Sequence, residues 1–142
     1  MPFQSIEKFT LITAGIIIFL MFLGFRFLGN VTFDNLPPVV IQTIPASGND
    51  SVEPFIKELR VVFSKKMMTK DMYSIVRINA NTFPKISGNI HFLDDSQTCI
   101  IPVELESGKT YAFWLNKGQW NSFRDISNNP AIPYLFVFKT MD

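Results

Sequence analysis

Two side chains with nucleophilic or metal-binding chemistry stand out, because His91 is the only histidine and Cys99 the only cysteine among 142 residues. A zinc site or a Ser-His-Asp arrangement needs several such groups to converge, so carboxylates would have to supply most of the zinc ligands. His91 alternates with Ile90 and Phe92, which predicts a solvent-facing histidine on a strand. Cys99 alternates with apolar residues and is interpreted as a small buried side chain rather than a nucleophile.

Acidic and amide side chains gather in two turn-like stretches that could supply oxygen ligands to calcium. The first is Asp94-Asp95, and the second combines Asp125 with Asn128 and Asn129. Neither has the spacing of an EF-hand loop, and Asp and Asn commonly bond their own backbone in turns. We therefore predict turns here and no metal site. The sequence also lacks a phosphate-binding glycine loop and a Cys-x-x-Cys pair, so we expect no catalytic residues, no cofactor and no enzymatic activity.

Trp120 and Phe123 form the candidate interaction surface, because both lie in the polar stretch 118–125. Exposed aromatic side chains on a loop above a rigid scaffold often bind peptides or sugars. The alternative is that both side chains fold back and close one end of the domain beside Trp114, since large aromatic residues are usually mostly buried. The sequence leaves both interpretations open.

The charge balance argues against nucleic acid as a partner. The chain has 13 basic and 12 acidic residues, of which Glu7, Lys8 and Arg26 lie within the first 29, so 11 of each sign remain. A domain without a basic field has nothing to attract phosphate backbones.

A long apolar run begins at Phe9 and ends at Leu28, with Arg26 as its only charge. Twenty residues span about 30 Å as a helix, which matches the hydrocarbon core of a bilayer. The run ends without the small residues of a cleavage site, so we predict an uncleaved transmembrane helix within a membrane anchor over residues 1–29. A cleaved signal peptide is the alternative. We expect the N-terminus in the cytoplasm and the rest of this single-pass protein in the periplasm or outside the cell.

The remainder is interpreted as a linker over residues 30–37 and a domain over residues 38–140. Short apolar or alternating stretches predict strands at residues 39–44, 58–64, 74–79, 89–93, 98–103, 111–115 and 134–139. Residues 80–88 are expected to be irregular, and Pro102 suggests an edge strand or a strand end. Methionines at near-helical spacing in residues 65–73 predict a single helical turn. The pattern as a whole indicates an all-β antiparallel sandwich.

The stretch that organises this domain contains Leu105, Gly108 and Tyr111. Gly108 can take the positive φ of a turn at no steric cost, and Tyr111 begins an alternating strand immediately after it. This spacing is the signature of a tyrosine corner, in which the phenol packs under the sandwich and its hydroxyl bonds upstream backbone. Gly108 and Tyr111 are therefore predicted to be structural residues.

Residues 37–140 resemble the bacterial Ig-like domain of the S-layer (SbsA) type. The resemblance depends on pieces that occur in the family's order, namely Pro45-Ala46-Ser47-Gly48, residues 59–67, the Asp94-Asp95 hairpin, residues 105–111, residues 125–130 and the closing residues 136–140. It implies a seven-strand sandwich that serves as a spacer or as an adhesion or binding accessory, without catalytic residues.

Together these features predict a membrane-tethered, non-catalytic binding or assembly module of the bacterial cell envelope, with an unidentified protein as its partner. The alternative is a secreted sandwich that binds carbohydrate or peptide through Trp120 and Phe123 after signal cleavage. A small hydrolase using Cys99 or His91 is the third hypothesis, and no sequence feature favours it.

Overall fold

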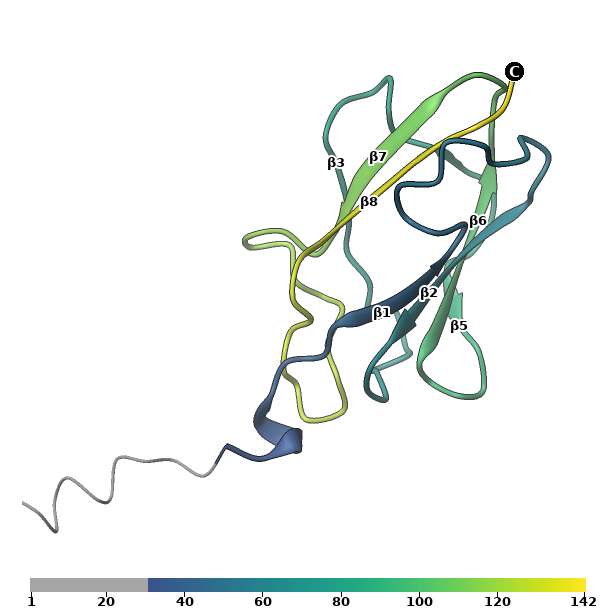
Figure 1. Cartoon of the computed structure of the whole chain (residues 1–142). Coiled ribbons are helices and arrows are strands. Elements are labelled where there is room, and N and C mark those ends of the chain that lie inside the picture. The colour runs from purple at the N-terminus through teal and green to yellow at the C-terminus, as the bar shows by residue number, and fades with distance from the viewer. Residues whose placement is uncertain (1–30) are drawn as a thin grey trace, which may run out of the picture. The chain divides into compact units, whose positions relative to one another are not determined.

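Two antiparallel sheets stack face to face in the computed structural model, which describes residues 31–142 (Figure 1). The larger sheet contains five strands, β1 (Val40–Ile44), β2 (Glu58–Phe63), β6 (Thr98–Glu104), β4 (Lys85–Ile86) and β5 (His91–Phe92). The smaller sheet contains three, β3 (Ile75–Arg77), β7 (Thr110–Leu115) and β8 (Tyr134–Lys139). A short 3₁₀ turn, η1 (Phe33–Asn35), precedes β1. The all-β prediction is confirmed, with eight strands in residues 31–142 where about seven were expected.

Aromatic side chains fill the space between the sheets. In the smaller sheet Tyr111 is paired with Phe138 and Phe113 with Phe136, and their ring centroids both lie 5.3 Å apart. Such cross-strand aromatic pairs stabilise antiparallel sheets beyond the area that they bury. The alternating residues of β7 are buried because its inward face meets the larger sheet, whose β2 and β6 contribute further buried side chains.

Pro102 lies in the middle of the larger sheet, so the prediction of an edge strand or a strand end was wrong. β6 pairs with β2 on one side and with the short β4 and β5 on the other. Val103 N donates to Lys57 O, so the neighbouring Pro102 nitrogen faces the opposite side. On that side β4 and β5 are separate, and Pro102 only accepts a bond from Ser87 N. The missing N–H therefore falls at a break between two short strands, where no ladder bond is required.

The predicted helical turn in residues 65–73 is also wrong. Met67 N donates to Ser96 O and Met68 N donates to Arg124 O, so this backbone bonds distant segments instead of itself. Met67 is buried in the core, and its backbone forms an isolated antiparallel β-bridge with Asp125. Three methionines at near-helical spacing were therefore a coincidence of sequence, since only Met67 is fully buried.

The tyrosine corner has the geometry that the spacing predicts. Gly108 has φ +65°, a region that other residues enter only with strain. Tyr111 is buried, and its hydroxyl oxygen accepts a hydrogen bond of 2.7 Å from Glu106 N. Thr140 closes the same corner, since its hydroxyl donates to Glu106 O.

Removing the Tyr111 hydroxyl tests this corner. Tyr111→Phe is expected to lower the free energy of unfolding by about 1–3 kcal/mol, because Glu106 N loses its partner in a part-buried site. Urea unfolding measures the change. Tyr73→Phe, at a side chain 41 % exposed, is the matched control and should change the stability by less than about 0.5 kcal/mol.

Within residues 31–142, no helix is long and apolar enough to cross a membrane. The predicted anchor, with its alternative of a signal peptide, lies in residues 1–29, outside the described part of the chain. These assignments stay predictions.

Candidate functional site

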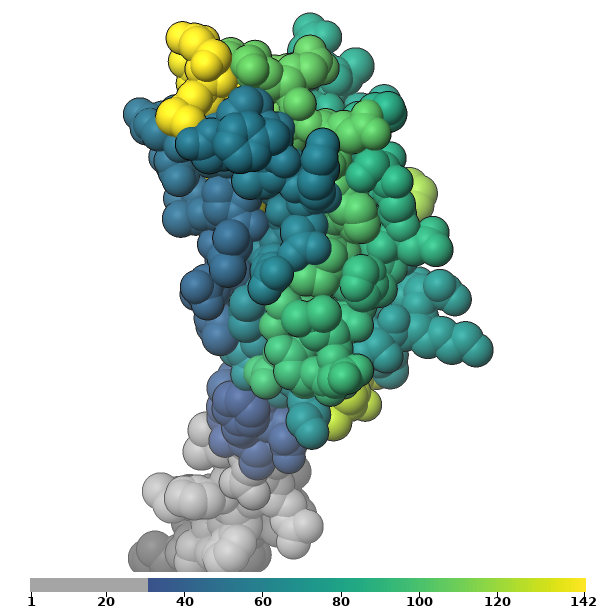
Figure 2. All heavy atoms as spheres, turned by 90° about the vertical axis from the view of Figure 1, so that its right-hand side faces the viewer, coloured from purple at the N-terminus to yellow at the C-terminus, as the bar shows by residue number. Residues whose placement is uncertain are grey.

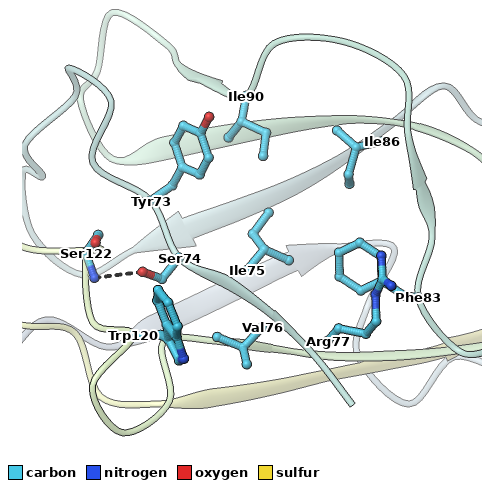
Figure 3. Close-up of a pocket in the computed structure, with 10 residues that line it drawn as sticks. All are labelled: Tyr73, Ser74, Ile75, Val76, Arg77, Phe83, Ile86, Ile90, Trp120 and Ser122. Carbon is cyan, nitrogen blue, oxygen red and sulfur yellow. Dashed lines mark hydrogen bonds between the residues drawn. The ribbon is translucent and has the colours of Figure 1, made fainter. Parts of the chain in front are cut away.

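A groove with a volume of about 670 Å³ runs along β3, where the edges of the two sheets come together (Figure 3). β3 is an edge strand, since it pairs only with β7 among the described strands. Ile86 and Ile90 come from the facing edge of the larger sheet. The side chain of Ile75 points from β3 toward them. Figure 3 shows Val76 and Trp120 on the other side of β3, so the groove wraps around this edge.

The chemistry of the groove is mostly apolar, with one charged side chain. The Arg77 guanidinium lies 4.8 Å from the centroid of the Phe83 ring and is the only ionic group in the lining. The Ser74 hydroxyl is already engaged, because it accepts a bond of 2.9 Å from Ser122 N. Apolar walls with a few polar groups are typical of sites that bind a ligand or a partner.

The two candidate surface residues, Trp120 and Phe123, differ in their exposure to solvent. Trp120 is 60 % exposed at the rim of the groove, where reciprocal backbone bonds with Lys117 hold its turn. Phe123 is 0 % exposed, so its assignment to an interaction surface was wrong.

Phe123 is buried because Asn116 pins its backbone inside the domain. Asn116 Nδ2 donates to Phe123 O at 2.9 Å, and Phe123 N donates to Asn116 Oδ1 at 3.0 Å. The Phe123 ring then packs against Phe63 and Phe92, with centroids 5.1 and 6.3 Å away. A polar loop therefore carries a core residue, three positions after an exposed one.

The other candidate residues take structural positions. His91 is exposed on β5, with Nδ1 3.1 Å from Asn89 O. Cys99 is fully buried, and burial raises the pKa of its thiol to about 12, which removes the thiolate at neutral pH. Asp95 accepts bonds from Thr98 and Gln97, and these bonds, led by the Thr98 hydroxyl, lower its pKa. In residues 31–142, no three His, Cys, Asp or Glu side chains lie close enough to hold a metal ion.

Asp125 has a larger role than the predicted turn, because it forms a buried ion pair with Lys65. Lys65 Nζ lies 2.5 Å from Asp125 Oδ2, and the two side chains are 7 % and 0 % exposed. The other carboxylate oxygen accepts backbone N–H bonds from Ser127 and Asn129, as the predicted turn requires. The Asp125 carboxylate is thus satisfied on both oxygens, a condition for a stable buried charge.

The same ammonium group attaches the start of the described chain to the domain. Lys65 Nζ donates to Leu36 O at 2.8 Å and to Asp34 O at 3.2 Å, and lies 5.3 Å from the Phe33 ring centroid. Asn129 Nδ2 adds a bond of 2.8 Å to Asp34 O. Residues 33–36, expected to belong to a linker, are therefore held on the sandwich. We call Lys65, Asp125, Asn129 and the carbonyls that they bind the ionic node.

These features define an immunoglobulin-like sandwich with an open, apolar sheet edge. Residues 34–140 match the family model described as a bacterial Ig-like domain. The chain belongs to this family, and the narrower SbsA type stays a prediction.

Two solved structures resemble the fold weakly. They are entitled "Crystal structure of the S-layer protein rSbsC(31-844)" and "Structure of surface layer protein SbsC, domains 1-6", at 17% and 20% identity and a TM-score of 0.46 each. Each match covers 73% of this chain and 14% of the S-layer chain, so this chain spans a small fraction of those proteins. A search of curated proteins gave no match.

Proposed function

We propose that this chain is a membrane-tethered, non-catalytic binding module of the bacterial cell envelope that recruits a protein partner through the groove along β3. The observation that carries the proposal is the exposed Trp120 at the rim of an apolar groove beside an edge strand. Tryptophan is over-represented among residues that dominate binding energy, and an open edge can accept an added strand.

The tether rests on the apolar run from Phe9 to Leu28, which is long enough to span a bilayer. With the N-terminus in the cytoplasm, the Ig-like domain faces the periplasm or the cell exterior.

The partner class follows from the walls of the groove. An extended polypeptide could pair its backbone with the outer edge of β3 and place apolar side chains against Ile75 and Ile90. An acidic group on it could meet Arg77, the single charge in the lining. The secreted, carbohydrate-binding alternative is favoured only by the exposure of Trp120, since Phe123 is buried and cannot provide a second stacking ring.

Photo-crosslinking in native membranes tests this function. We expect Tyr73 replaced by p-benzoylphenylalanine, a photoreactive side chain in the groove lining, to form an adduct with one discrete protein. Adding Trp120→Ala should lower the adduct yield by about tenfold or more, because hot-spot truncation costs 2 kcal/mol or more. The stability should change by less than about 0.5 kcal/mol, since Trp120 is largely exposed.

The matched control is Ile44→Ala, a half-exposed apolar residue on β1, the opposite edge of the larger sheet. This variant should keep the full adduct yield. An equal loss in both variants, or no protein adduct at all, would reject the groove as the recruiting surface. An adduct with polysaccharide instead would favour the carbohydrate alternative.

A further inference from the structure

Apolar side chains gather at the end of the domain where the described chain begins. Phe33 is 65 % exposed and Ile126 68 %, and both belong to a group that we call the basal patch, consisting of Phe33, Leu36, Ile126 and Ile132. Hydrogen bonds bring the segments together, because Ile132 N donates to Pro38 O and Asn129 Nδ2 donates to Asp34 O. Figure 2 shows η1 at this end and the C-terminus at the opposite end.

The basal patch is held in place, although it consists of loops and one 3₁₀ turn. The ionic node fixes the backbone of residues 34 and 36, and the Lys65 ammonium lies against the Phe33 ring. Ile126 N donates to Lys66 O, which ties the second loop to the segment that follows β2. Four exposed apolar residues on ordered backbone mark an interaction site, because soluble domains rarely expose contiguous apolar surface to water.

The length of chain before the patch limits what can cover it. Only four residues, 29–32, separate Phe33 from Leu28, the last residue of the apolar run, so the two residues cannot lie more than about 18 Å apart. If the run spans a bilayer, Phe33 stays within reach of the headgroup layer, which is about 5–8 Å deep on each side. The short connection would therefore hold the basal patch close to lipid, which makes a lipid surface the apolar partner within reach.

The exposed charges beside the patch balance one another, so the apolar side chains have to supply the attraction to lipid. Lys66, the neighbour of Ile126 by hydrogen bond, is exposed, and Lys70 on the same segment is exposed as well. Asp125 is neutralised by Lys65, which leaves Asp34 and Asp71 as the exposed acids of these segments. Apolar side chains of elements that lie on a bilayer insert about 5–10 Å into the interface, and balanced charges do not oppose this insertion.

We propose that the basal patch docks into the headgroup region of the bilayer, so that the domain lies on the membrane instead of moving freely above it. This inference rests on the proposed membrane anchor. Docking would hold the groove at a fixed height and orientation relative to the lipid surface, which reduces the ordering cost when the groove captures a partner.

Depth-dependent fluorescence quenching tests the docking in the full chain. Ile126→Cys and, as a matched control, Phe55→Cys are labelled with an environment-sensitive fluorophore and reconstituted into vesicles of phosphatidylcholine and phosphatidylglycerol with a shallow spin-labelled lipid. Phe55 is also exposed and apolar, and it follows Val52, which pairs with Thr140 near the C-terminus. Buried Cys99 stays, because its protonated thiol should take up no label in the unsubstituted folded protein.

Docking predicts at least about twofold quenching at position 126 and little at position 55, since interfacial side chains reach the depth of the spin label. Equal, weak quenching at both positions in protein that resists alkaline extraction would overturn the docking while leaving the anchor intact. Protein that alkaline washing removes from the vesicles would overturn the anchor, and the docking with it. If the patch acts as one surface, adding Phe33→Ser to the Ile126→Cys chain should reduce the quenching at position 126.

Discussion

Replacing Lys65 by methionine is expected to lower the free energy of unfolding by about 3–5 kcal/mol, which is the cost of leaving a buried charge unpaired. Asp125 would keep its carboxylate at 0 % exposure without its counterion. Asp34 O and Leu36 O would lose the same donor, so the segment that leads into the domain should loosen as well.

Urea unfolding of single and double variants separates the pair from its surroundings. Lys65→Met with Asp125→Leu should recover most of the loss, because two apolar side chains carry no unpaired charge. Lys85→Met is the control, since Lys85 pairs with Glu104 at the surface, where solvent screening leaves an ion pair with little effect on stability. A loss below about 1 kcal/mol in Lys65→Met would contradict a buried, stabilising node.

The same pair gives the stability a defined dependence on acid. Burial by itself raises the pKa of Asp125, but the hydrogen bonds from Lys65 and Asn129 outweigh it and lower the pKa overall. The folded pKa therefore lies below the unfolded value of about 3.9, so the contribution is complete above that pH and is lost as the pH falls through the folded pKa. In the Lys65→Met, Asp125→Leu chain, the part of the acid-induced loss that comes from Asp125 should disappear.

Phe123→Ala, as a single substitution, is expected to lower the free energy of unfolding by about 3–5 kcal/mol, because it removes a buried ring from the centre of an aromatic cluster. The ring packs between Phe63 and Phe92, and Asn116 holds its backbone from both sides. The cavity that the substitution creates cannot collapse easily, since the hydrogen bonds between strands hold the sheets on either side in place.

Comparison with Trp120→Ala in the same urea experiment shows which aromatic residue of the loop belongs to the core. The two residues are three positions apart, yet only the Phe123 variant should lose stability. Similar, small losses in both variants would mean that Phe123 is accessible, and would restore it to the interaction surface.

The strands could largely be predicted because their alternation is local. Tyr111, Phe113 and Leu115 face inward in β7 as their spacing indicates, and the bounds of β8 match residue for residue. β4 escaped prediction because Lys85–Ile86 is too short to show a period. Pro102 misled because a proline is compatible with a central strand when the neighbouring strand is interrupted, which only the tertiary structure reveals.

The candidate site was predicted less well, because its parts are distant in sequence. Lys65 and Asp125 are 60 residues apart, and Lys65 ends an ordinary strand pattern that gives no sign of a buried partner. The groove joins Ile75, Ile90 and Trp120, and the sequence pattern around the first two does not distinguish a groove wall from the core. Trp120 could be singled out because a large aromatic residue in a polar loop is a local signal, and its role in an interaction stays a prediction.

Tethering is the central claim, and the mass of the intact protein in native envelopes tests it most directly. Membranes are washed with alkaline carbonate, and the protein is then extracted and measured by mass spectrometry alongside the soluble fraction. We predict a membrane-retained chain that still carries residues 1–29. A soluble chain that begins after the apolar run would contradict the tether and would leave a secreted sandwich in its place.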